Sequence, residues 1–188
     1  MKSFLMNSRP FADALQVTTH LPSTEDAFNS GREETGPTLD ESLNGAEYST
    51  FAGAVVICHI FNQILKHIHR PTPKDRPDDV NHGPFWMRHR ELDNMLSSIF
   101  MFLPERFRLP KNIRDPVALH TNLNLHASII CLHNAASDKA DKFGLPSYIK
   151  KMSQERALTA AQEITNIMKL SSHITATYVS LPPSLKHV

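Results

Sequence analysis

Cysteine is scarce in this sequence, because only Cys58 and Cys131 occur among its 188 residues. The two lie in separate helical patterns, so they do not provide the framework of a small disulfide-stapled domain. This scarcity favours a reduced nuclear or cytosolic compartment over secretion.

Net charge is also small. Lys and Arg number 20 against 19 Asp and Glu, which gives +1, so the chain as a whole is drawn neither to nucleic acid nor to an anionic membrane. One loop is locally basic, and we interpret it as a solvated connector rather than a DNA contact, because Glu105 and Asp115 dilute its charge. Its cations are Arg106, Arg108, Lys111 and Arg114.

Long apolar runs are missing. Residues 1–6 are too few for a signal peptide, and polar residues follow them at once. The longest apolar block, residues 51–61, contains His59 and is well below the roughly 20 residues that a membrane span needs. We therefore predict neither a signal peptide nor a membrane-spanning helix.

Catalytic and metal-binding motifs are absent as well. The sequence holds no His-Glu-x-x-His, Cys-x-x-Cys, Gly-x-Ser-x-Gly or phosphate-loop pattern, although it has 11 histidines. His126 and His133 share a helix face but stand about 10 Å apart along the axis, too far to bind one metal ion. Cys131 and His133 point in nearly opposite directions, so they do not pair as nucleophile and base. We predict no enzyme activity and no cofactor in this chain.

What the sequence does contain is helical periodicity. Residues 84–103 form the clearest pattern: Pro84 suits a first helical position, and an apolar stripe follows. The stripe consists of Phe85, Leu92, Leu96, Ile99 and Leu103. Charged residues three or four positions apart on this helix should pair, and these are Arg88 with Glu91, Arg90 with Asp93, and His89 with Asp93.

Similar patterns predict long helices over residues 47–69, 116–142 and from 147 or 153 to 171. Capping signals predict two short helices before them, one between Ser23 and Gly31 and one between Thr38 and Asn44. We therefore expect an all-α fold, an irregular bundle of four main helices plus short N-terminal ones. Its expected parts are a partly ordered arm (1–46), the helical domain (47–173) and an irregular tail (174–188).

Burial can be predicted along two of these helices. In 116–142 we expect Leu125, Ile129 and Leu132 to be buried and the opposite face to be exposed. That opposite face is assigned to Thr121, Ser128 and Lys139. In the last helix the expected apolar stripe consists of Ala157, Ala161, Ile164 and Met168.

The central pattern resembles the middle, regulatory region of fungal transcription factors that carry a binuclear zinc cluster. The aromatic and basic entry is Phe85-Trp86-Met87-Arg88-His89-Arg90-Glu91-Leu92-Asp93. A leucine–proline turn and a His- and Leu-rich helix at 119–133 follow it, and the likeness runs from about Leu21 to about His173.

The resemblance implies a nuclear protein that controls transcription through intramolecular contacts and contacts with regulatory proteins or the transcription machinery. Zinc-dependent DNA binding belongs to a separate six-cysteine module in that family, which two cysteines cannot build. DNA would thus be reached only through that absent module, and zinc would be bound there. A free-standing helical interaction scaffold without a transcriptional role is the alternative.

Several polar residues fall within or beside the apolar arcs. In one interpretation they line an internal ligand or partner pocket that senses a small molecule; in the other, the histidines are neutral core residues bonded to neighbouring helices. The residues are Arg88, His89, Asn122, His126 and His133. The resemblance also implies that more helices flank this chain, so we expect it to be marginally stable alone and to self-associate through its last helix.

Overall fold

The computed structural model describes residues 19–70, 72 and 74–180, and for 174–180 the backbone alone. These residues form an all-α structure without strands, apart from one isolated bridge between His20 and Thr38. The all-α prediction is therefore confirmed. The elements are α1 (Glu25–Ser30), α2 (Leu39–Leu43), α3 (Thr50–His69), α4 (Pro84–Met101), the 3₁₀ turn η2 (Glu105–Phe107), α5 (Pro116–Lys142) and α6 (Ser147–Ser180).

The two short helices begin and end where their capping residues predict. The Thr24 hydroxyl accepts a hydrogen bond from the Ala27 amide at the start of α1, and Gly31 ends that helix with a left-handed φ of 65°. Thr38 and Glu41 form a reciprocal capping box at the start of α2. The segments before residue 19 and after 180 lie outside the described residues.

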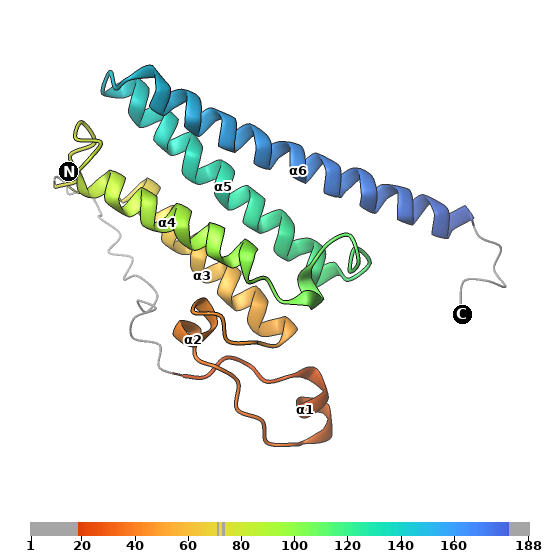
Figure 1. Cartoon of the computed structure of the whole chain (residues 1–188). Helices are drawn as coiled ribbons and strands as arrows, with labels where there is room; N and C mark the ends of the chain where they lie inside the picture. Colours follow the sequence, from red (N-terminus) through yellow and green to blue (C-terminus); the bar gives the residue numbers. More distant parts are fainter. Residues whose placement is uncertain (1–18, 71, 73, 181–188) are drawn as a thin grey trace, which may run out of the picture.

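α5 lies at the centre of the bundle. It packs against α3, α4 and η2 on one side and against α6 on the other (Figure 1). Its start and end match the predicted range, because Asp115 caps the helix and Pro116 occupies its first turn. α1 and α2 lie at one end of α3, away from α6 (Figure 1).

The main core lies between α3, α4 and α5. Leu125 and Leu132 of α5 are fully buried there, as predicted, and Phe107 of η2 fills the space beside α3. Its other large side chains are Leu21, Leu39, Tyr48, Val56, Ile57, Ile60, Ile64, Leu92, Leu96, Ile99 and Leu103. Burial of this aliphatic surface supplies the main stabilisation of the bundle.

A second, smaller cluster closes the opposite end of the bundle. Phe85 and Trp86 at the start of α4 pack with Ala136 and Ala140 of α5 and with Ile149 of α6. The indole Nε1 of Trp86 donates a 2.7 Å hydrogen bond to the carbonyl of Pro77, so its polar group is satisfied despite burial.

The predicted exposed face of α5 is wrong. Thr121 and Ser128 are each only 1% exposed, and Ile129 is only half-buried. Thr121 lies four residues before Leu125, and Ser128 lies three after it, so all three occupy the same helix face. The prediction misplaced the helix phase, and the small hydroxyl side chains belong to the core-facing stripe.

α6 differs from its prediction in length and in phase. The helix continues to Ser180, whereas an irregular tail was predicted from residue 174. Its buried stripe is narrow and consists of Ile149, Ser153, Ala157, Ala160 and Ile167. Of the predicted stripe, Ala157 is buried, Ala161 and Ile164 are half-buried, and Met168 is 53% exposed, so the predicted stripe was partly rotated from the true contact face. Leu158 is 69% exposed, which leaves apolar surface on this helix.

The apolar block considered in the membrane prediction lies in α3. α3 as a whole has 20 residues, and by length and composition alone it could cross a membrane. Six of its residues are buried within the bundle, and a core helix meets the same two criteria. Its outer face nevertheless leaves Phe51 60% exposed.

Candidate functional site

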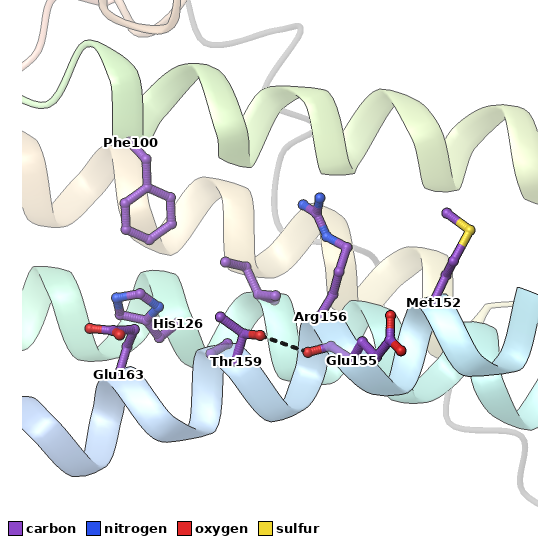
Figure 2. Close-up of a pocket in the computed structure, with 9 residues that line it drawn as sticks. Phe100, His126, Met152, Glu155, Arg156, Thr159 and Glu163 are labelled. Atoms are coloured by element: carbon purple, nitrogen blue, oxygen red, sulfur yellow. Dashed lines mark hydrogen bonds between the residues drawn. The ribbon is translucent and has the colours of Figure 1, made fainter.

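A groove runs between α4 and α6, with α5 as its floor. Its volume is about 420 Å³. α6 supplies one face over three turns, α5 supplies His126 and Ile129, and α4 supplies Phe100 (Figure 2). The α6 residues are Met152, Glu155, Arg156, Thr159, Ala160 and Glu163. We call this feature the α6 groove.

The floor of the α6 groove is mainly apolar. The rings of Phe100 and His126 approach with their centroids 5.0 Å apart. Burial lowers the pKa of His126 despite the opposing effect of Glu163, so the ring is neutral at pH 7. Its Nδ1 is buried and lacks a hydrogen-bond partner. The floor therefore offers apolar contact without a positive charge.

Arg156 connects the α6 groove to the neighbouring helices. Its Nε donates a 3.0 Å hydrogen bond to His133 Nε2 on α5, and its Nη2 binds Asp93 Oδ1 on α4. Burial raises the pKa of Asp93, but its hydrogen bond with His133 and the charge of Arg156 outweigh this effect and hold the pKa below its usual value. The positive charge of Arg156 is thus compensated within the protein.

Behind this cluster, imidazole rings continue into the interior. The rings of His133 and His89 pack edge to face at 5.2 Å, and His67 of α3 stacks on Phe85 at 4.5 Å. Burial lowers the pKa of His89 to about 3 and that of His67 to about 4. Each of these three histidines has one buried ring nitrogen without a hydrogen-bond partner.

The five residues proposed from the sequence do not line one pocket. Only His126 lines the α6 groove, whereas His89 and His133 contact each other in the interior. Arg88 binds Glu91 and Gln63, each at 3.0 Å, which confirms its predicted pair with Glu91.

The fifth residue, Asn122, has a local structural role. Its side-chain amide donates to the carbonyl of Phe107 at 2.7 Å and to that of Ala118 at 2.8 Å. It therefore fastens η2 to α5, which places Phe107 in the core, and it does not reach the α6 groove.

Most residues of the α6 groove were not predicted, because the groove depends on how separate helices pack together. The α6 lining recurs at helical spacing, but nothing in the sequence shows that α4 approaches the same face. Asp93 was predicted to pair with Arg90, which instead donates to the carbonyls of Val80 and Asn81. The partner of Asp93 is Arg156, 63 positions away.

The sequence analysis also made predictions about the basic loop and about metal binding. In the basic loop, Arg108 lies 3.8 Å and Lys111 3.1 Å from Glu105, so part of its charge is paired. Among the described residues, no group of three or more His, Cys, Asp or Glu side chains is arranged to hold a metal ion.

Comparison with known proteins identified fungal transcription activators. The chain is 28% identical over 155 residues to the pigment biosynthesis transcriptional activator pigB of Monascus ruber, which covers 80% of this chain and 28% of that protein. It is 26% identical over 157 residues to the citrinin biosynthesis transcriptional activator mrl3 of the same species, covering 81% of the chain and 30% of the relative.

A third relative comes from another genus. The depudecin biosynthesis cluster-specific transcription activator DEP6 of Fusarium langsethiae is 28% identical over 127 residues, which is 66% of this chain and 19% of that protein. The chain thus spans less than a third of the length of these curated relatives. No family model and no solved structure matches it. The relatives are transcription activators rather than enzymes, which supports a role in transcription regulation.

Proposed function

We propose that this chain is part of the regulatory region of a fungal transcription activator that acts in the nucleus. The observation that carries the proposal is the similarity to pigB, which extends over 80% of this chain. Regulation would occur through contacts between these helices and other protein segments. DNA binding, and any zinc that it requires, would reside in a separate module.

The structure supports a binding role in two ways. The α6 groove is concave and largely apolar, which is typical of sites that bind ligands or peptides. Large apolar side chains are also exposed on α3, α4 and α6, including Phe51, Met101 and Leu158. Exposed apolar surface of this kind marks interaction sites when it forms contiguous patches.

A helical interaction scaffold without a transcriptional role is the second candidate. The same exposed side chains and the same groove would serve such a protein equally well. The two candidates differ in whether the chain changes the output of an attached activator.

A reporter experiment separates them. The chain is inserted between a heterologous DNA-binding domain and an activation segment in a fungal host. A regulatory region should change reporter output several-fold, and a fusion carrying Leu125→Asp, which places a charge in the core, should lose that effect. Unchanged output with an intact, nuclear fusion protein would contradict the proposed function and favour the scaffold.

A further inference from the structure

We propose that the α6 groove binds an amphipathic helix of a partner protein, one with an apolar stripe of about three turns and basic residues along one edge. This inference deepens the proposed function and rests on it for its biological meaning. Its physical basis is the shape and charge of the α6 groove.

The shape favours a helix over a compact ligand. The lining of α6 extends from Met152 to Glu163, which is about 16 Å along the helix axis. α6 contributes at positions three or four residues apart, so its side chains form a continuous wall. Phe100 of α4 stands on the opposite side (Figure 2), and Ile129 of α5 also lines the groove. A partner helix that lay between α4 and α6 would place its apolar side chains against α5, the floor of the groove.

The acidic rim of the α6 groove favours a partner helix with basic residues along one edge. Glu155 and Glu163 lie on the rim at exposed positions. Glu155 forms a long ion pair with the exposed Lys151 at 3.9 Å, and Glu163 accepts a 3.5 Å hydrogen bond from the Asn166 amide. Arg156 is held by Asp93 and His133, so it does not neutralise the rim.

The floor adds no opposing charge, because His126 is neutral. The rim of the α6 groove therefore presents two exposed carboxylates, with a long, solvent-exposed pair to Lys151 at Glu155. Such a rim should favour Lys and Arg and disfavour acidic partners, chiefly through selectivity and association rate.

A second copy of this chain fits less well. Two copies that dock the same groove about a two-fold axis would bring identical carboxylates, Glu155 and Glu163, towards each other. The exposed Leu158 and Met168 are not among the groove residues, so self-association through them would leave the α6 groove open.

The test is a calorimetric titration of the whole chain with a synthetic helical peptide of about four turns. The peptide carries leucines on one stripe and lysines along one edge, and a matched peptide carries glutamates in place of the lysines. We expect micromolar binding of the basic peptide and binding of the acidic peptide weaker by about ten-fold or more.

Three variants locate the site. The double variant Glu155→Lys/Glu163→Lys should lower the affinity for the basic peptide by about ten-fold or more and raise the affinity for the acidic peptide. Glu33→Lys/Glu47→Lys makes the same change in charge at exposed sites far along the chain and should leave both affinities unchanged. Thr159→Trp places a bulky side chain in the α6 groove at an exposed position and should block binding, with circular dichroism confirming an intact fold.

Several results would overturn the proposal. One is no peptide binding at millimolar concentration, and another is binding that ignores both groove variants. If Thr159→Trp instead abolishes dimerisation in ultracentrifugation, the occupant is a second copy. If a neutral apolar dye binds in a groove-dependent way and the peptide does not, the occupant is a small molecule. Because none of these measurements involves transcription, their failure is distinguishable from failure of the reporter experiment.

Discussion

Arg156 of α6 donates a 3.0 Å hydrogen bond to His133 of α5 from its Nε atom. The accepting Nε2 atom of His133 lies 3.3 Å from Asp93 Oδ1, so His133, Asp93 and Arg156 form one cluster. The same guanidinium binds Asp93, so one side chain joins three helices. This arrangement holds one wall of the α6 groove in place.

The first prediction concerns this connection. Arg156→Ala should lower the free energy of unfolding by about 1–2 kcal/mol, because two charged hydrogen bonds are lost from a half-exposed site. Urea titration measures the change. Lys151→Ala removes the exposed ion pair between Lys151 and Glu155, whose charged atoms are 3.9 Å apart. It should lower the free energy of unfolding by no more than about 0.5 kcal/mol. Equal effects of the two variants would show that Arg156 is not a structural link.

The second prediction concerns coupling between the same residues. In a double-mutant cycle of Asp93→Asn and Arg156→Gln, the two effects should be non-additive by about 1 kcal/mol, since the side chains are in direct contact. A coupling energy near zero in equilibrium unfolding would contradict the contact.

The third prediction concerns Gly53 in α3. Replacing a helical glycine by alanine usually stabilises a helix by about 0.5–1 kcal/mol. Here an added Cβ would overlap Cζ of the Phe107 ring, which is fully buried. Gly53→Ala should therefore destabilise the protein by about 1–3 kcal/mol, the usual cost of overpacking.

A companion variant tests that explanation. Phe107→Leu shortens the side chain, so adding Gly53→Ala to Phe107→Leu should cost less than adding it to the native protein. Thermal denaturation of all four proteins measures the difference. A stabilising Gly53→Ala in the native background would mean that Phe107 packs elsewhere.

The fourth prediction concerns pH. Burial depresses the pKa of His89 from 6.5 to about 3 and that of His67 from 6.5 to about 4. Between these values and 6.5 the unfolded chain binds more protons than the folded one, so stability is full above pH 6.5 and falls as the pH drops below it. The loss should approach about 1.4 kcal/mol per pH unit for His89 and be smaller for the more exposed His67.

Urea titrations from pH 7.5 down to pH 4.5 measure this slope. His89→Phe should flatten it, whereas His69→Gln, a change at an exposed histidine, should not. A slope that is unchanged in His89→Phe would mean that other groups cause the loss.

Much of the fold could be predicted because helix boundaries depend on local chemistry. The Thr38–Glu41 capping box, the left-handed Gly31 and Pro116 in the first turn of α5 each act within a few residues of themselves. The start of α4 and both limits of α5 followed from such signals. α6 continues beyond its predicted end at Ser171, as far as Ser180 within the described residues.

Burial and the α6 groove were harder to predict because they depend on contacts between helices. Thr121 and Ser128 are small polar residues, so the apolar pattern of α5 did not indicate that they would be buried. His126, which the sequence analysis named, lines the α6 groove, but Glu155, Arg156 and Glu163 look like an ordinary solvated face until α4 is placed beside them. The link from Asp93 to Arg156 spans 63 positions and has no local signature.

The central position of α5 also orders events during synthesis. α3 and α4 leave the ribosome before the helix on which both pack, so their apolar stripes stay uncovered until α5 emerges. α5 and α6 are separated by a short turn at Gly144. Many of the residues that they bring into contact are near each other in the sequence, and such local contacts form quickly during folding. We infer that the α5–α6 hairpin forms as a unit and that the earlier helices then dock on it. Nascent chains that stop short of α5 should therefore depend most on chaperones.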